Sequence, residues 1–369
     1  MEQKKIIVTG GSGFIGQQLL QAGMKTNDAC YLGGHRIVNI DKFKPKIRYG
    51  VVPTFEADLT DPESTSKVFN EAVNWLGGVD YVFNMVAKVS YTLPFRKLEE
   101  INVKTAFNIT HECAKYKAFL IHMSGTAVHG HVDRAIKETD PLNYVEAYGK
   151  SKAIAEEEIF RISKEKNLRS LIFRSTAPIG PGLETAGINE LYKMITDQPL
   201  VLATKGSRVT YVSTEDIGRT FVFAAENQDR IWKNPEKLSD IVYNLGVEES
   251  FTDKQVGEHL VKIILGEGKK KVRELPIWIV QLGSYPIEWS NALANIVRKE
   301  REEPNMSISL AKLIKGPHFQ DPTKFKQNFE GFHFKHPTPE DVLNTGVIHK
   351  YQTEWKERKK TKFVEDLLK

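Results

Sequence analysis

The sequence predicts an α/β fold built on a doubly wound parallel sheet. Two observations carry this prediction. A glycine-rich turn separates an apolar strand pattern, Lys5 to Thr9, from a helical pattern, Phe14 to Met24. Strand and helix patterns then alternate along the first half of the chain. Such alternation is typical of parallel sheets whose crossovers are right-handed and whose ligands bind at the carboxyl ends of the strands.

The glycine turn comes first. Gly10, Gly13 and Gly16 have the spacing GxxGxxG between the first strand and the first helix. Glycine permits the tight turn, the close approach of a ligand and the packing of helix on strand. The free N–H groups at a helix N-terminus attract phosphate. The turn therefore predicts a dinucleotide site, with an ordinary strand–helix connection as the alternative.

The second strand pattern, Arg36 to Ile40, ends at Asp41. A carboxylate at that place accepts hydrogen bonds from the adenosine ribose hydroxyls and repels a 2′-phosphate. Asp41 therefore favours NAD over NADP, although Lys42 and Lys44 follow it and weaken the preference. The alternative for Asp41 is a solvated turn residue.

The other elements of the predicted sheet follow in order. The expected strands are Val51 to Ala57, Val79 to Ala87, Phe119 to Ser124 and Leu168 to Arg174. The expected helices are Pro62 to Leu76, Asn102 to Tyr116 and a long helix within Pro141 to Glu165. The carboxyl ends of these strands, where ligands bind in such folds, are marked by Asp41, Asp58, Ala87 and Ser124.

Composition limits the classes of function. The 369 residues are 40% hydrophobic and 27% charged, as in a soluble globular protein, and the net charge of +5 gives no case for nucleic acid. Cys30 and Cys113 lack metal-ligand spacing and form no disulfide framework, so no metal is expected and a cytoplasmic location is predicted. Met1 leads straight into the first strand, which argues against a signal peptide, and no apolar run reaches the ~20 residues of a membrane span.

A second motif supplies chemistry. Tyr148 and Lys152 are four residues apart on the predicted long helix and share one face. A nearby ammonium favours the phenolate form of tyrosine, which makes the phenol a useful acid or base. Lys150 is out of phase and is expected to face solvent. Behind a dinucleotide turn, the pair predicts proton transfer coupled to hydride transfer.

Together these motifs resemble the extended short-chain dehydrogenase/reductase superfamily, which holds nucleotide-sugar epimerases and dehydratases and the 3β-hydroxysteroid dehydrogenases. The matching segments cover most of the chain: Thr9 to Gly16, Asp41, Asp58-Leu59, Asn84 to Ala87, Asn102-Val103 with Thr105, Ser124 to Gly130, Tyr148 with Lys152, Arg174 with Pro178 to Gly182, and Tyr211 to Gly218.

The resemblance implies a Rossmann fold with a small C-terminal α/β substrate-binding cap, and NAD as cofactor. It implies Tyr148 as the acid/base and Lys152 as its partner. The cofactor residues that it implies are Gly10, Gly13, Phe14, Ile15, Gly16, Asp41, Asp58, Leu59, Ala87, Tyr148, Lys152 and Pro178. The superfamily usually has a hydroxyl residue where this chain has Gly125, so Ser124 or Thr126 is expected to replace it, with Thr126 slightly favoured. Asn84 to Ala87 departs from the more usual histidine and small residues.

The predicted domains are a cofactor-binding core with the catalytic helix, residues 1–180, and a mainly substrate-binding region, residues 181–369, with segments that return to the core. Two apolar stretches of the second region, Pro276 to Leu282 and Tyr285 to Ala294, are expected to pack in the cap or to line an apolar pocket. The superfamily often pairs two helices across a twofold axis, so a homodimer is expected, with Phe107, Ile154 and Phe160 as contacts.

Three functions remain open. The favoured one is an NAD-dependent oxidoreductase that interconverts a secondary alcohol and a ketone on a hydrophobic, 3β-hydroxysteroid-like small molecule. The second is a nucleotide-sugar epimerase or dehydratase with tightly bound NAD. The third is a non-catalytic dinucleotide-binding protein; the Tyr148–Lys152 pair argues against it, and Gly125 keeps it open.

Overall fold

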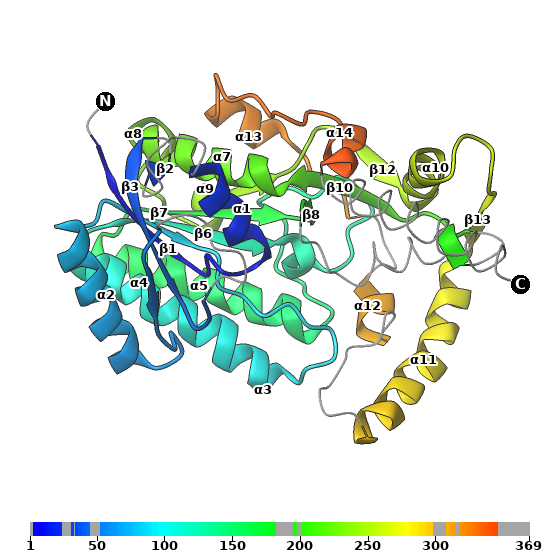
Figure 1. Cartoon of the computed structure of the whole chain (residues 1–369), viewed down its shortest axis with the longest axis horizontal. Coiled ribbons are helices and arrows are strands. Elements are labelled where there is room, and N and C mark those ends of the chain that lie inside the picture. Colours follow the sequence, from blue (N-terminus) through cyan, green and yellow to red (C-terminus); the bar gives the residue numbers. More distant parts are fainter. Residues whose placement is uncertain are drawn as a thin grey trace, which may run out of the picture.

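A central parallel sheet organises the molecule, with helices on both of its faces (Figure 1). The computed structural model describes residues 3–23, 31–32, 34–44, 52–181, 195–197, 201–297, 308–313 and 318–345. The predicted Met24 and Cys30 lie outside these residues, as do Val51 and Gly182.

The sheet has eight strands in the order β11-β7-β6-β5-β1-β3-β2, with β4 paired to β3. Its strands are β1 (Lys5–Thr9), β2 (Tyr31–Leu32), β3 (His35–Asp41), β4 (Thr54–Glu56), β5 (Tyr81–Asn84), β6 (Phe119–Gly125), β7 (Ser170–Ser175) and β11 (Val242–Leu245). All pairings are parallel except that of β2 with β3. The predicted Rossmann arrangement is therefore confirmed.

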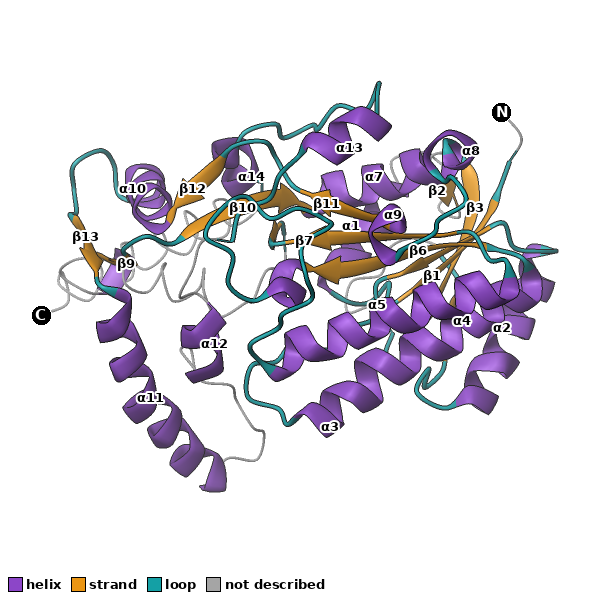
Figure 2. Cartoon of the chain, turned by 180° about the vertical axis from the view of Figure 1, so that it is seen from behind, coloured by secondary structure: helices purple, strands orange, loops and turns teal. Residues whose placement is uncertain are grey.

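Two groups of helices cover the sheet, one on each face (Figures 1 and 2). The first group contains α2 (Pro62–Leu76), α3 (Phe95–Leu98), the π-helix η1 (Glu99–Val103), α4 (Lys104–Tyr116) and α5 (Ala147–Lys166). The second contains α1 (Phe14–Gly23), α7 (Thr214–Glu226), α8 (Gln228–Ile231) and α13 (Thr323–Asn328). A short helix, α9 (Leu238–Ile241), precedes β11.

Local signals explain where the helices begin and end. The α2 helix has the predicted bounds because Asp61 caps it by accepting from Ser64 N, Pro62 is its first residue, and Gly77 ends it at φ +73°. The predicted strand Val51 to Ala57 is shorter, as β4, and Val79 to Ala87 is a strand only in β5. The predicted helix from Asn102 begins earlier, with the π-helix η1.

Smaller sheets extend the molecule beyond the carboxyl ends of the central strands. Three strands pair in the order β12-β10-β8, and two pair as β13-β9. The remaining elements are η2 (Thr126–His129), β8 (Ala177–Ile179), β9 (Val201–Thr204), β10 (Arg208–Ser213), β12 (Ser250–Thr252), α10 (Asp253–Ile264), β13 (Val272–Leu275), α11 (Ile277–Val297), α12 (Ile308–Leu313) and α14 (Pro339–Asn344). A second apolar cluster, separate from that of the central sheet, lies among β10, α10 and α14.

Helix α11 projects from the body of the molecule (Figures 1 and 2) and turns an apolar side to solvent. The large side chains of this outer side, spaced to lie along one face of a helix and 50–72% exposed, are Trp278, Leu282, Tyr285, Trp289 and Leu293. The sequence predicts that this stretch packs in the cap or lines a pocket; among the described residues its outer side is exposed instead.

The opposite side of α11 makes polar contacts. Ser284 is buried, Gln281 Nε2 donates to the carbonyl of Ala311, and Glu288 Oε2 accepts from Ile308 N. The last two contacts are with α12. Two hydrogen bonds thus join α11 to α12.

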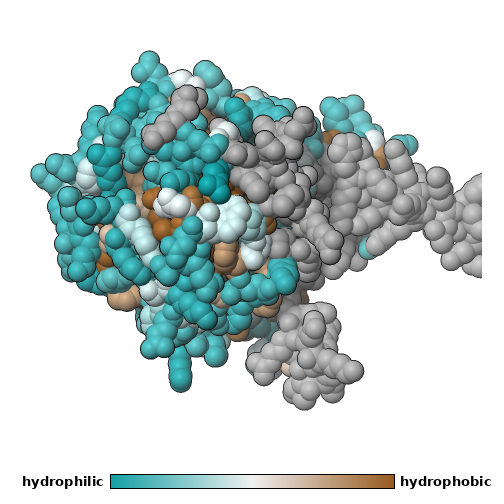
Figure 3. Space-filling view, turned by 60° about the vertical axis from the view of Figure 1, so that its left-hand side comes forward, coloured by the Kyte–Doolittle hydropathy of each residue, from teal (hydrophilic) through white to brown (hydrophobic). Residues whose placement is uncertain are grey.

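Another face of the molecule is more polar than the outer side of α11. The face shown in Figure 3 is predominantly hydrophilic and has only small apolar areas. Such areas are normal on soluble proteins. Within the described ranges, no helix is both long and apolar enough to cross a bilayer.

Candidate active site

The glycine turn forms a tight cradle at the carboxyl end of β1. Gly10 has φ +78°, and a Cβ there would lie 2.8 Å from the backbone nitrogen of Val86. A Cβ on Gly16 would lie 2.2 Å from the carbonyl oxygen of Gly10, so this position admits only glycine. Gly13 is exposed, and its added Cβ would meet only the Gly10 carbonyl, at 3.2 Å.

This geometry fits a dinucleotide. The open side of Gly13 faces the start of α1, whose first residues are Phe14 and Ile15. The N–H groups of a helix's first turn have no intrahelical partner, so they are available to a pyrophosphate. The backbone packs closely around Gly10 and Gly16, whereas Gly13, at the start of the helix, is accessible to a ligand.

Asp41, at the end of β3, already holds the glycine turn. Its Oδ2 accepts from Ser12 N at 2.9 Å and its Oδ1 from Phe43 N at 3.1 Å. Asn39, two residues earlier, accepts from Gly11 N through its Oδ1 at 2.9 Å. Asp41, which the sequence predicts to hold the adenosine ribose, is thus bonded to the glycine turn.

The other predicted cofactor residues lie along the same edge of the sheet, after their strands. Asp58 accepts from Lys42 Nζ at 2.6 Å, and this bond is the main cause that lowers the pKa of the Asp58 carboxyl to about 2. Leu59 is buried, Ala87 is exposed, and Pro178 lies in β8, half-buried.

Tyr148 faces Gly125. A Cβ built on Gly125 would lie 3.9 Å from the Tyr148 hydroxyl oxygen. The ring of Tyr91 meets the Tyr148 ring edge-on, with centroids 5.9 Å apart. Burial raises the pKa of the Tyr148 phenol above its ordinary value, and the Glu146 carboxylate raises it further. The phenol therefore needs a compensating positive charge or a proton acceptor before it can act as a base.

The two hydroxyls that flank Gly125 are engaged elsewhere. Ser124 donates to Glu156 Oε1 at 2.5 Å, inside the protein. Thr126 donates to Thr176 Oγ1 at 3.2 Å. Glu156 lies eight residues beyond Tyr148 on α5, so the Ser124 hydroxyl is bonded to another part of that helix. Neither hydroxyl forms a hydrogen bond with Tyr148.

Lys152 is fully buried and is bound to β6. Its Nζ donates to the carbonyl of Met123 at 2.8 Å and lies 3.1 Å from His122 Nε2. Burial lowers the pKa of Lys152 to about 8, against the opposing effect of Glu156. No hydrogen bond joins Lys152 to Tyr148 among the described residues. Lys150, expected to face solvent, is half-buried, with its ammonium 4.1 Å from the centre of the Phe95 ring.

A buried ion pair fixes the Tyr148–Lys152 helix. Glu156 is four residues beyond Lys152 on α5, and both of its oxygens accept from Arg174 Nε of β7, at 3.0 and 3.1 Å. Arg174 Nη1 lies 2.8 Å from His129 Nε2, and burial, followed by the Arg174 charge, lowers the pKa of His129 to about 4. The neutral histidine accepts from the guanidinium and donates from Nδ1 to the carbonyl of Pro141.

Asn102, which the sequence analysis matched to the superfamily but gave no role, joins three parts of the site. Its Oδ1 accepts from Lys88 N at 2.7 Å, and its Nδ2 donates to the Lys88 carbonyl and to Ser151 Oγ. It lies in η1, and π-helical turns are frequent at functional sites. Glu156 was also missed, although its i+4 spacing from Lys152 was a visible signal.

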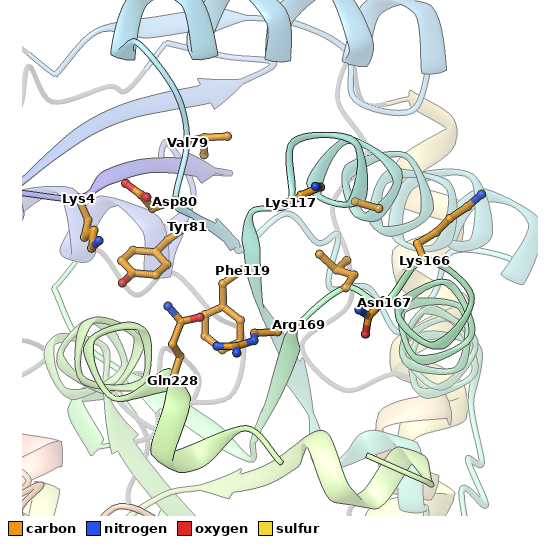
Figure 4. A pocket seen from close by; sticks show the side chains of 12 residues that line it. Lys4, Val79, Asp80, Tyr81, Lys117, Phe119, Lys166, Asn167, Arg169 and Gln228 are labelled. Atoms are coloured by element: carbon orange, nitrogen blue, oxygen red, sulfur yellow. The ribbon is translucent and has the colours of Figure 1, made fainter. Parts of the chain in front are cut away.

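A cavity of about 470 Å³ lies at the opposite end of the sheet, where the strands begin. Lys4, Tyr81, Phe119 and Arg169 line it at the amino ends of their strands, together with Gln228 (Figure 4). The glycine turn follows the carboxyl end of β1, so this cavity is separate from the candidate active site. Two of its lysines, Lys117 and Lys166, lie at the C-termini of α4 and α5, where cations are ordinarily favourable.

Comparison with known proteins agrees with this geometry. Residues 6–246 match the family model of the NAD dependent epimerase/dehydratase family, and the chain belongs to this family. The predicted superfamily, the enzyme class and NAD as cofactor are thereby confirmed.

Two relatives and one solved structure show the range of similar proteins. A putative UDP-glucose 4-epimerase of Methanocaldococcus jannaschii is 25% identical over 242 residues, 62% of this chain and 74% of the relative. A 2-alkyl-3-oxoalkanoate reductase of Stenotrophomonas maltophilia is 25% identical over 186 residues, 48% of this chain and 52% of the relative.

The solved structure is the Bordetella bronchiseptica enzyme WbmG in complex with NAD and UDP. The two structures match with a TM-score of 0.67 at 16% sequence identity, and the match covers 97% of this chain and 96% of the WbmG chain. At that identity the likeness concerns the fold.

The buried ion pair generates a prediction on stability. We expect Glu156→Gln to lower the free energy of unfolding by about 3–5 kcal/mol, because it leaves the Arg174 charge buried without its counter-ion. Glu158→Gln is the matched control on the same helix: Glu158 pairs with Arg161 at the surface, and its loss should change stability by at most about 0.5 kcal/mol. Urea unfolding of the two variants measures both; equal, small effects would contradict the assignment.

Proposed function

We propose that this protein oxidises and re-reduces a secondary alcohol carbon of a nucleotide sugar, with NAD as the hydride acceptor and donor. This is the second of the functions that the sequence left open. The observation that carries it is the family match over residues 6–246, together with a relative and a fold neighbour concerned with UDP or a UDP-sugar. They support this reading over a steroid-like substrate.

The chemistry follows from the site. We assign the pyrophosphate to Gly10, Gly13 and Gly16 with the first turn of α1, and the adenosine ribose to Asp41. Asp58 and Leu59 would border the adenine, and Ala87 and Pro178 the nicotinamide end. NAD, when bound, supplies the carbon that accepts hydride. Tyr148 takes the hydroxyl proton as the hydride leaves, and returns it in the reverse step.

Gly125 shapes the space around the substrate oxygen. Because Ser124 and Thr126 bond to partners elsewhere, we propose that the substrate oxygen is held by Tyr148 without a second side-chain hydroxyl from this loop. The ring of Tyr91, which packs edge-on against that of Tyr148, would form an aromatic wall of the substrate site.

A second function is favoured by a specific observation. One relative is named a 2-alkyl-3-oxoalkanoate reductase, so its substrate is a ketone with alkyl chains. The outer side of α11 in this chain is apolar. Under this reading the chain would reduce or oxidise a hydrophobic substrate in one direction, with free exchange of NAD. This was the function that the sequence analysis favoured.

Analysis of the purified protein separates the two. Tightly retained NAD, with interconversion of nucleotide sugars and no net NADH, supports the epimerase or dehydratase. Freely exchanging NAD, with NADH formed in step with a hydrophobic alcohol, would instead establish the second function.

We further propose a homodimer through α4 and α5, which lie side by side (Figure 2). Phe107 is exposed there, and Ile154 and Phe160 are half-buried. The cytoplasmic location and the boundary at residue 180 stay predictions.

The first functional prediction concerns Tyr148. Tyr148→Phe removes one oxygen, so folding and NAD affinity should persist while turnover falls by about 10²-fold or more, the scale of a lost general acid/base. Steady-state rates with calorimetric NAD titration measure both. Near-normal turnover on any substrate of the wild type would contradict the mechanism and leave the dinucleotide site intact.

A second prediction concerns cofactor choice. NAD should bind at least ~10-fold more tightly than NADP, because a 2′-phosphate would meet the Asp41 carboxylate. Asp41→Asn should narrow the gap by removing the charge while keeping an acceptor for Ser12 N. Tighter NADP binding to the wild type in calorimetric titration would overturn the assignment.

A third prediction tests the missing hydroxyl. Gly125 has an extended backbone that any residue adopts, and its added Cβ would lie 3.3 Å from the Ser175 carbonyl oxygen, a tight contact that both side-chain variants below share. We expect Gly125→Ser to raise turnover by roughly 10-fold, because its hydroxyl would donate to the oxygen on which charge develops. Gly125→Ala is the control with the same Cβ and no hydroxyl. A serine variant no faster than the alanine variant contradicts this prediction.

A further inference from the structure

The outer side of α11 forms one uncharged apolar surface. Its large side chains recur every three or four residues, so they lie within about a quarter of the helix circumference. They are Trp278, Leu282, Tyr285, Trp289 and Leu293. Single exposed apolar side chains are normal on a protein, whereas a contiguous patch of them marks a binding surface.

The place of α11 in the molecule suits a flat surface. Its 21 residues form a rod about 30 Å long that projects from the body (Figures 1 and 2). Gln281 and Glu288, which is the one charged residue in the sequence of α11, bind α12 and leave the outer side exposed. A projecting ridge of this kind needs no preformed groove when the surface that it meets is the interface of a fluid bilayer.

Positive charge gathers at the amino end of α11. A cavity of about 600 Å³ lies between α10 and β13, and its lining has more cations than acids. The cations are Lys254, Lys262, Lys270, Lys271 and Arg273, and the acids are Glu258 and Glu267. Within the part of the chain that the structure describes, the side chains of Lys262, Lys271 and Arg273 form no hydrogen bond or ion pair. These three charges are therefore available to an anionic partner.

The basic cavity and the apolar side belong to one region of the surface. Lys271 directly precedes β13, and Arg273 is the second residue of that strand, so both point to the same side of it. Arg273 is four residues before Ile277, where α11 begins, and four residues span at most about 14 Å. The uncharged side of the helix thus continues into a cationic area at its amino end.

We propose that the outer side of α11 docks on the surface of an anionic lipid bilayer. The helix lies along the interface, with its tryptophans and Tyr285 at the level of the headgroups and its leucines directed toward the acyl chains. The basic cavity meets the lipid phosphates and carboxylates, which adds electrostatic attraction to the apolar burial. This inference goes beyond the proposed function, because it concerns where the protein binds and not what the active site does.

Vesicle binding tests the proposal directly. The full-length protein is mixed with vesicles of phosphatidylcholine, alone or with about 30% phosphatidylserine, and bound protein is measured by flotation. We expect binding to the mixed vesicles to be at least ~10-fold tighter than to phosphatidylcholine alone and to weaken as salt is added. Absence of binding to the mixed vesicles overturns the proposal.

Two tryptophan variants test the apolar contribution. Replacing Trp278 and Trp289 together by Ser should weaken binding to the mixed vesicles by about 10²-fold, because both side chains lose their burial in the interface. Trp75→Ser is the matched control, since Trp75 is exposed on α2. It should bind vesicles as the wild type does. A double variant that binds like the wild type contradicts docking through α11.

A second pair of variants tests the electrostatic contribution. Lys271→Gln with Arg273→Gln should weaken binding to the mixed vesicles by about 10-fold and leave binding to phosphatidylcholine unchanged. Lys117→Gln with Lys166→Gln removes the same charge from the cavity at the amino ends of the strands and should have little effect. Equal losses in the two pairs would show that net charge alone attracts the protein, and the proposed orientation would be wrong.

Light scattering distinguishes a bilayer from a second copy of the chain. Without lipid, at the low protein concentration of the vesicle assay, the wild type and the double tryptophan variant should have the same mass. A larger mass that the double variant abolishes, together with no binding to vesicles, would make the outer side of α11 an interface between copies. The NAD affinity of every variant should equal that of the wild type, which confirms that each is folded.

Discussion

The buried pair of Arg174 and Glu156 is the interaction on which the site's geometry depends. Two charges removed from water cost several kcal/mol each, and only close, multiple hydrogen bonds offset that cost. Here the carboxylate takes the guanidinium and the Ser124 hydroxyl, and the Arg174 carbonyl accepts from Gln320 Nε2 at 2.6 Å. The pair thereby joins α5, β6, β7 and a segment about 150 residues further along the chain.

Helix α5 is held by polar contacts of this kind in addition to apolar packing. The residues that it buries include Ser151, Lys152, Glu156 and Ser163, alongside small and branched apolar side chains. An apolar stripe tolerates sliding and rotation, whereas hydrogen-bonded partners admit one register. The placement of Tyr148 beside Gly125 therefore follows from polar contacts several residues away from either.

The sequence predicted much of the fold and only part of the site. The periodicity of apolar residues was enough for α2, whose structural limits are also local: Asp61 caps it and Gly77 ends it. Local signals were insufficient for Ser124 and Thr126, whose partners Glu156 and Thr176 lie 32 and 50 residues away. The outward side of α11 was missed for a similar reason: an apolar stripe at helical spacing normally marks the buried side, and only the contacts to α12 show the reverse.

The exposed apolar side of α11 makes the association state of the isolated chain dependent on its concentration. Five large side chains each leave half or more of their area in water. Burying that area contributes on the order of 1 kcal/mol per side chain, whatever surface supplies the cover. A mass, a rate or a melting temperature measured on this protein is therefore expected to depend on the protein concentration and on any amphiphile in the solution. Both need to be controlled as carefully as the pH.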